Sequence, residues 1–273
     1  SMIRPASYCG VYGFKPTRGM ISRSGVLQTS VSLDQIGTFG RTLADAALLA
    51  DVIGGYDQND PASFPRPRPS AADGVSQEVP VAPDFSWLDL PYFDRLADDA
   101  REGLEEVISL LEAQVKRETA ANTLSDLVRV QACIHEYEIC QHQAEVFKNS
   151  WELISDTLKP IIERGQKISA EEYEDSLEVK RSAESFFDEF FTEFDAIIAP
   201  AAPGEAPPFG KNTGDPIFST IWTLAGLPCV TLPLLVGAND LPIGVQLIGP
   251  KERDDRLMRT ANWLQQHLTA EAA

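Results

Sequence analysis

Short apolar runs near both ends of the chain alternate with polar or small residues, whereas the middle of the chain follows a helical period. Runs at 8–14, 195–199, 229–233 and 243–249 predict strands that belong to one sheet. Between them, 94–194 carries apolar residues at helical spacing, and we expect its helices to lie on one side of that sheet. This order favours an α/β fold with a mixed β-sheet flanked by helices.

Two capping boxes mark where helices begin. Thr42 with Asp45 starts one helix, which ends at the Gly-Gly pair 54–55, and Ser169 with Glu172 starts another. Helical spacing predicts the inner face of the first helix as Ala46, Leu49, Ala50 and Ile53, and that of the second as Ala183, Phe187, Phe190 and Phe194.

Seven prolines interrupt the hydrophobic pattern between residues 57 and 91. Because proline disfavours helices and central strands, this stretch predicts an extended connection on the surface. The chain has no internal repeat. We therefore expect residues 1–273 to form a single domain that contains this Pro-rich connection.

Composition narrows the class of protein. Of the 273 residues, 43% are hydrophobic and 23% are charged, which is typical of a folded globular protein. Asp and Glu number 41 against 23 Lys and Arg, and the resulting charge of -18 disfavours nucleic acids and anionic membranes as partners. The sequence has four cysteines, no bilayer-length apolar run and no visible signal peptide, so we expect a cytoplasmic protein.

The chain carries fragments of several binding motifs and completes none of them. Residues 204–211 have a spacing one residue too long for a phosphate-binding loop, and 57–68 lacks the Gly and the final Glu of a calcium loop. The Cys and His residues of 133–142 fall on nearly opposite faces of a helix and do not converge on a zinc ion. No G-x-S-x-G motif occurs. We expect no metal and no cofactor.

The opening of the chain contains Cys-Gly at 9–10 and Gly-Phe-Lys-Pro-Thr at 13–17, preceded by an Arg-Pro pair at 4–5. In these features it resembles the second half of the amidase signature, the motif of a family of amide hydrolases. The resemblance continues in chain order at 32–37, 41–47, 57–60, 194–200, 222–228 and 241–249. It covers nearly all of the chain.

The resemblance implies an α/β fold and a serine hydrolase mechanism. Family members use a nucleophilic serine, a second serine in a cis peptide, and a lysine that acts as base through that second serine. Ser1 matches the nucleophile, because it precedes Pro5 by four positions. A serine hydroxyl needs a neighbouring base, and a lysine serves as one only where its pKa is lowered. Lys15 matches the Lys-Pro-Thr motif and not the catalytic lysine, so we expect it to anchor a strand end.

Relative to the family pattern, the match begins at the nucleophile. The family's lysine, its bridging serine and its Gly-Gly pair lie N-terminal to the segment matched here, so we expect a chain truncated on its N-terminal side. Met2 is a candidate translation start, in which case Ser1 is a residue added for expression. The oxyanion hole, which the family forms from backbone N–H groups beside the nucleophile, is then incomplete as well.

Four other residues are candidates for the site. Arg4 matches the family's arginine near the nucleophile, with a role in loop positioning through an acidic partner or, alternatively, as surface charge. Candidates for the lining of an acyl pocket that binds the substrate are Phe218, Ile221 and Trp222, with core packing as the alternative.

Two hypotheses about function remain open, with an unrelated α/β protein as a third. The first is an amidase that cleaves the C–N bond of a small-molecule amide, working only with the missing N-terminal half. The second is a non-catalytic amidase remnant or interaction module. In both cases a sheet deprived of neighbouring strands predicts exposed apolar surface, and hence docking of the missing half or self-association.

Overall fold

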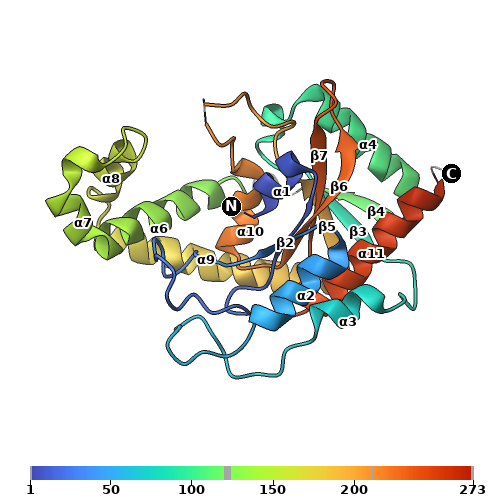
Figure 1. The fold of residues 1–273 in the computed structure, drawn as a ribbon, viewed down its shortest axis with the longest axis horizontal. Coiled ribbons are helices and arrows are strands. Elements are labelled where there is room, and N and C mark those ends of the chain that lie inside the picture. Colours follow the sequence, from blue (N-terminus) through green and yellow to red (C-terminus); the bar gives the residue numbers. More distant parts are fainter. Residues whose placement is uncertain (1, 120–123, 211, 272–273) are drawn as a thin grey trace.

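One seven-stranded mixed sheet lies between two layers of helices in the computed structural model, which describes residues 2–119, 124–210 and 212–271 (Figure 1). The strands are β1 (Tyr12–Lys15), β2 (Thr38–Gly40), β3 (Phe85–Leu88), β4 (Val115–Glu118), β5 (Ala196–Pro200), β6 (Cys229–Val236) and β7 (Pro242–Ile248). The described helices are α1 (Ile3–Cys9), α2 (Leu43–Ile53), α3 (Ala71–Ser76), α4 (Asp98–Leu111), α6 (Leu127–His142), α7 (Ala144–Asn149), α8 (Lys159–Gly165), α9 (Ala170–Phe190), α10 (Ile217–Leu224) and α11 (Asp254–Glu271). Short 3₁₀ turns are η1 (Phe93–Arg95), η2 (Glu112–Gln114) and η3 (Trp151–Leu153).

The strands follow the order β2-β1-β6-β7-β5-β3-β4 across the sheet. Neighbours are antiparallel from β2 through to β5, whereas β3 runs parallel to both β5 and β4. The four apolar runs that were predicted to share a sheet supply β1, β5, β6 and β7. The predicted α/β fold with a mixed sheet is therefore confirmed.

One side of the sheet packs on α2 and α11, and we call it the α11 face. Phe14, Val230 and Leu247 are in register across β1, β6 and β7, so their side chains point to the same side. Phe14 borders a small cavity together with Ala50 of α2 and Asp254 of α11. The apolar residues of three strands thus share one layer of helices.

The opposite side packs on α1 and α10, and we call it the α10 face. The side chain of Gln246 in β7 donates a hydrogen bond to the carbonyl of Phe218 in α10 (3.0 Å). The backbone N–H of Gly244 donates to the hydroxyl of Ser7 in α1 (2.7 Å). Gly244 and Gln246 alternate with the residues of the α11 face, as the period of a strand requires.

The helices of the middle segment are divided between the two faces, so the expectation that all of them lie on one side is wrong. Gly103 of α4 packs against Leu235 of β6, on the α11 face. Phe187 of α9 packs edge-on against Trp222 of α10 on the other face, with ring centroids 5.5 Å apart. Figure 1 shows α4 beside α11 and α9 beside α10. A helical period identifies the buried stripe of a helix but not the side of the sheet that buries it.

The chain begins with a helix where the sequence predicted a strand from residue 8. α1 covers Ile3–Cys9 and ends at Gly10, whose φ of 62° is the left-handed conformation of a C-cap. The strand starts only at Tyr12. A Cβ on Gly13 would lie 2.5 Å from the Cβ of Ala6. The glycines that looked like interruptions of a strand therefore end α1 and let it lie flat on β1.

Both predicted capping boxes are present, but the inner face of α2 differs from the prediction. The hydroxyl of Thr42 accepts a hydrogen bond from the N–H of Asp45, and Ser169 does the same for Glu172. In α2, Leu49 and Ile53, two of the residues predicted to face inward, are each 44% exposed. The buried residues are Leu43, Ala46, Ala47 and Ala50. Small residues face the sheet because α2 lies close to it, which turns the larger side chains outward.

The Pro-rich stretch is more structured than an extended surface connection. It contains α3 and the strand β3, which is buried at all four positions between β5 and β4. A four-residue strand is too short to show a period, and Pro83 and Pro91 lie close on either side of it. β4 was not predicted either, because it lies inside the segment predicted to be helical.

Large apolar side chains are exposed on the outer side of α2, next to the edge strand β2. Their exposed fractions are 56% for Leu48, 44% for Leu49, 72% for Val52 and 44% for Ile53. We call these four residues the α2 surface. Among the described strands, β2 pairs only with β1, so its other edge is open. Exposed apolar surface beside an open sheet edge is what the sequence led us to expect.

Candidate active site

A cavity of about 380 Å³ lies beside Met2, the first residue that the structure describes. Helices α6 and α10 contribute two of its walls, and the loop at 29–35 contributes a third. We call it the α10 cavity. Ser1, the predicted nucleophile, lies outside the described residues. Because Ser1 is covalently joined to Met2, the α10 cavity is the candidate active site.

The wall formed by α10 consists of residues that carry hydroxyl groups. Ser219, Thr220 and Thr223 line the cavity, together with Pro216 just before the helix. The hydroxyl of Thr220 donates to the carbonyl of Pro216 (3.2 Å), one turn earlier. Ser219 is only 7% exposed, and its hydroxyl has no hydrogen-bond partner in the described part of the chain.

The three residues of α10 predicted to line an acyl pocket lie on the other side of that helix. Phe218, Ile221 and Trp222 are 1%, 0% and 0% exposed, and none of them borders the α10 cavity. Phe218 packs edge-on against Tyr92, with ring centroids 5.4 Å apart. All three lie in the core, which is the packing role given above as the alternative. Spacing along an eight-residue helix did not identify which side faces the cavity.

Arg4 in α1 positions the loop that leads into α10. Its guanidinium donates to the carbonyl of Gly214 (2.9 Å) and to the hydroxyl of Thr213 (3.3 Å), so its described partners are neutral groups. Gly214 has a φ of 85°, and a Cβ there would lie 2.3 Å from the hydroxyl of Tyr8. Glycine at 214 therefore allows the loop to pass directly over α1.

Lys15 anchors the end of β1 at the floor of the cavity. Its ammonium donates to Oε1 of Gln35 (2.9 Å) and to the carbonyl of Leu227. Burial lowers the pKa of Lys15, and this effect outweighs the opposing influence of Cys229 and Asp254. Gln35 donates in turn to the carbonyl of Thr223 at the end of α10 (3.2 Å). Lys15 and Gln35 thus connect the sheet to the hydroxyl-bearing helix.

The loop wall of the cavity is fixed by Glu138, a buried carboxylate on α6. It accepts hydrogen bonds from the hydroxyls of Ser30, Ser32 and Tyr173, the last at 2.7 Å, and from the backbone N–H of Ser32 (3.0 Å). Asp34 closes the same loop by accepting from the N–H groups of residues 29 and 30. Hydrogen bonds to a carboxylate are stronger than bonds between neutral groups, so this wall is rigid.

Sequence reasoning missed the two residues that α6 contributes to the cavity. Gln131 and His135 are one helical turn apart and both border the α10 cavity. His135 was expected to be an exposed histidine in a helix that packs through its other faces. Its spacing from Gln131 was visible in the sequence, but nothing in the sequence brought either residue to α10. Within the residues that the structure describes, neither side chain has a hydrogen-bond partner.

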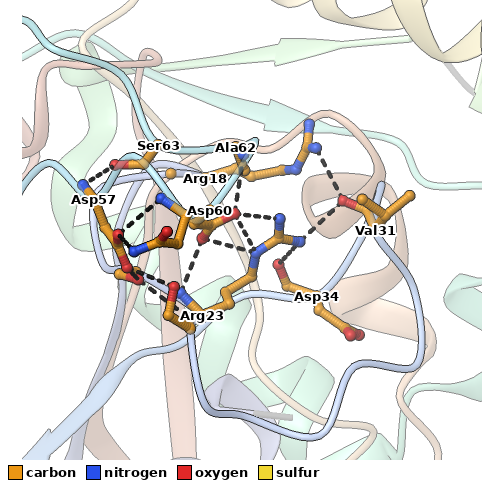
Figure 2. A network of polar contacts seen from close by, with 12 residues as sticks. Arg18, Arg23, Val31, Asp34, Asp57, Asp60, Ala62 and Ser63 are labelled. Atoms are coloured by element: carbon orange, nitrogen blue, oxygen red, sulfur yellow. Dashed lines mark hydrogen bonds and ion pairs between the residues drawn. The ribbon is translucent and has the colours of Figure 1, made fainter.

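A dense network of charged groups lies on the other side of the loop at 22–35 (Figure 2). Arg23 and Asp60 form a buried ion pair of 2.6 Å between Nη2 and Oδ1. Asp60 also accepts from the backbone N–H of Ala62 (2.9 Å), and Arg23 donates to the carbonyls of Val31 (2.9 Å) and Asp34 (3.3 Å). Hydrogen bonding from Arg23 lowers the pKa of Asp60 to about 2.

Asp57 extends this network toward the surface. Its carboxylate accepts from the hydroxyls of Ser22 (2.6 Å) and Ser24 and from the backbone N–H of Asn59 (2.9 Å). These bonds lower the pKa of Asp57 to about 2. The segment at 57–60, one of those that carry the family resemblance, thus holds the loop at 22–24 and does not border the α10 cavity.

No cluster of three or more His, Cys, Asp or Glu side chains within the described ranges is placed to hold a metal ion. Cys133 and Cys140 are buried in α6, and His135 faces the cavity instead. In the same ranges, none of the helices has the length and apolar character needed to cross a membrane.

Comparison with known proteins identifies the class to which this fold belongs. The model of the Amidase family matches residues 1–258, and the chain belongs to this family. Family members are amide-hydrolysing enzymes. The resemblance read from the sequence is confirmed.

Individual relatives are similar over nearly the whole chain. The A subunit of glutamyl-tRNA(Gln) amidotransferase from Agathobacter rectalis is 30% identical over 293 residues, which is 96% of this chain and 58% of the relative. The crystal structure of the corresponding amidotransferase chain from Thermotoga maritima is 29% identical with a TM-score of 0.71, covering 94% of this chain and 58% of that one.

Other solved structures share the fold at lower identity. The 6-aminohexanoate cyclic dimer hydrolase, complexed with substrate, has a TM-score of 0.83 at 21% identity and covers 98% of this chain and 62% of that one. A chain of a vestigial protein complex connected with the origins of an s-triazine catabolic enzyme has a TM-score of 0.87 at 23% identity. The match covers 97% of this chain and 60% of that one. The present chain thus spans about 60% of the length of the relatives it matches.

Proposed function

We propose that this chain forms part of an amide hydrolase in which Ser1 is the nucleophile and the α10 cavity receives a small-molecule amide. The observation that carries the proposal is the cavity beside Met2, in a chain that matches the Amidase family from residue 1 to residue 258. The resemblance of 1–17 to the amidase signature assigns the nucleophile to Ser1, which precedes Met2 in the sequence. Arg4 positions the loop before α10, and Lys15 positions the end of that helix.

In the proposed reaction, the hydroxyl oxygen of Ser1 attacks the carbonyl carbon of the amide while its proton passes through a bridging serine to a lysine. The C–N bond then breaks, the amine leaves with that proton, and the acyl group remains on Ser1 as an ester. Water hydrolyses this ester, which gives the carboxylic acid and restores the serine. Backbone N–H groups beside Ser1 stabilise the negatively charged oxygen in both steps.

The lysine and the bridging serine have no counterpart in this chain by the resemblance, so the proposal requires the family segment that carries them. This segment is supplied by the same polypeptide or by a second one. The α2 surface supports its docking, because large exposed apolar side chains beside an open sheet edge favour an interface. One relative is named as part of a multi-chain amidotransferase, and one structural neighbour belongs to a protein complex.

The test compares the chain alone with the chain combined with the polypeptide encoded immediately upstream of the Met2 codon, expressed in frame or separately. Acetanilide, benzamide and hexanamide are the substrates. We expect no measurable turnover by the chain alone and turnover by the combination, which Ser1→Ala lowers about a million-fold. Turnover by the combination that survives Ser1→Ala would disprove the role of Ser1. Turnover by the chain alone would disprove the need for the additional segment.

The α2 surface also favours the second candidate function, an interaction module without activity. Val52→Lys places a charge on this surface, whereas Val146→Lys is a matched control on α7, where the valine is 50% exposed. We expect Val52→Lys to weaken the association of the chain with the upstream polypeptide about tenfold or more in sedimentation experiments, because a desolvated charge opposes an apolar interface. Val146→Lys should leave this association unchanged. Equal effects of the two variants would exclude the α2 surface as the interface. Association without turnover in the combined protein would favour the interaction module over the amidase.

A further inference from the structure

We propose that the α10 cavity selects amides that carry a second, uncharged hydrogen-bonding group, and that Ser219 binds this group. This second group is a carboxamide or a hydroxyl. The inference rests on the proposed function, because it takes the α10 cavity as the substrate site. It adds what that function leaves open, namely the substrate class and a residue that recognises it.

The hydroxyl of Ser219 is the first observation. The residue borders the cavity, is 7% exposed, and finds no hydrogen-bond partner in the described part of the chain. Its neighbour Thr220 behaves differently, because its hydroxyl donates to the carbonyl of Pro216 one turn earlier. Buried hydroxyls in folded proteins are normally bonded, and leaving one without a partner is costly. A ligand in the cavity would supply the missing partner.

The wall formed by α6 is the second observation. Gln131 and His135 border the same cavity, are partly buried, and have no hydrogen-bond partner in the ranges that the structure describes. An amide side chain and a neutral imidazole each offer both a donor and an acceptor. With Ser219, two helices therefore present three unpaired groups of mixed donor and acceptor character to one space. A group such as a carboxamide, which also donates and accepts, complements them.

The charges at the cavity favour an uncharged ligand. The ammonium of Lys15 is bonded to Gln35 and to the carbonyl of Leu227, so it is not free for an anion. The carboxylate of Asp34 accepts from the backbone and hydroxyl of Thr29 and from the N–H of residue 30, so it is not free for a cation. The net charge of -18 further disfavours anions.

The experiment uses two amides with the same number of non-hydrogen atoms, succinamide and hexanamide. Binding to the 273-residue chain is measured by titration calorimetry, and kcat/KM is measured on the combined protein that turns amides over. Ser219→Ala removes the hydroxyl, Ser219→Thr retains it, and Ser185→Ala on α9 is a control for an exposed serine. Thermal unfolding of each variant checks that the fold is intact.

We expect succinamide to bind the chain, and Ser219→Ala to weaken that binding and lower its kcat/KM by about three- to tenfold, the range of one lost hydrogen bond. Hexanamide should lose less than succinamide, Ser219→Thr should restore the preference, and Ser185→Ala should change neither amide. Absence of succinamide binding, or equal losses for the two amides, would overturn the inference.

The failures of the two proposals are distinguishable. If the combined protein hydrolyses hexanamide as well as succinamide and Ser219→Ala changes neither, the amidase function stands and this inference fails. If succinamide binds through Ser219 but no amide is hydrolysed, the subsite stands and the amidase function fails.

Discussion

The loop at 22–35 separates two polar regions that differ in whether their hydrogen bonds are satisfied. On one side, the charges of Arg23, Asp57 and Asp60 are paired with one another, with hydroxyls or with backbone groups (Figure 2). On the other side, Ser219 borders the α10 cavity, and its buried hydroxyl has no hydrogen-bond partner among the described residues. The first region carries more charge, yet we propose the second as the ligand site. Polar groups whose hydrogen bonds are complete stabilise the fold, whereas a buried group without a partner calls for an explanation, such as a bound ligand or water.

The two regions also differ in how they are assembled. The charged network joins segments 37 positions apart in the chain, through Arg23 and Asp60. The α10 cavity combines residues from the start of the chain, the loop at 29–35, α6 and α10. A site assembled from four distant segments depends on the fold more than the network does.

The largest expected effect concerns the buried ion pair. Asp60→Ala leaves Arg23 buried without its partner, which typically costs about 3–5 kcal/mol of the free energy of unfolding. Glu105→Ala is the matched control, because Glu105 pairs with Arg117 at the surface, where an ion pair contributes about 0–1 kcal/mol. Urea unfolding followed by circular dichroism measures both. Similar losses in the two variants would mean that the network of Figure 2 does not hold the fold.

The contributions of Asp60 and Asp254 to stability should change with pH in opposite directions. The pKa of Asp60 is lowered to about 2, so its contribution is present above the unfolded pKa of about 4 and is lost as the pH falls toward 2. Burial raises the pKa of Asp254 to about 6, so its contribution is present below about pH 4 and is lost as the pH rises through 6.

Each of these two contributions should amount to about 2–3 kcal/mol between its limits. Unfolding is measured from pH 2 to pH 7. Asp60→Asn should flatten the dependence on the acid side, and Asp254→Asn should flatten it between pH 4 and pH 6. A dependence in either range that remains unchanged in the corresponding variant would show that another group titrates there.

The smallest expected effect has the opposite sign. Ser219→Ala removes a buried hydroxyl that has no partner within the described ranges, so it should raise the free energy of unfolding of the chain by about 1 kcal/mol. Ser185→Ala, at an exposed position of α9, should change it by less than about 0.5 kcal/mol. Chemical unfolding without ligand provides the measurement. A loss of stability in Ser219→Ala would show that its hydroxyl is already bonded, and the contrast between the two polar regions would disappear.

The sequence by itself determined the family, the fold class and the local signals. The capping bonds of Thr42 and Ser169 were predictable because each joins residues three positions apart. The four apolar runs of the sheet were predictable because buried strands must be apolar, whatever their neighbours are. The order of the family motifs predicts Ser1 as the nucleophile, and this stays a prediction because Ser1 lies outside the described residues.

The tertiary structure alone decided which sides of the helices meet. Glu138 holds Ser30 across 108 positions of the chain, and no local pattern connects two such residues. The same holds for Ser219 and His135, which share a cavity only because α6 and α10 pack together. Periodicity selects the buried stripe of a helix through the hydrophobic effect, which has no direction. The partner that covers the stripe, and the polar side left facing a cavity, follow from packing between segments far apart in sequence.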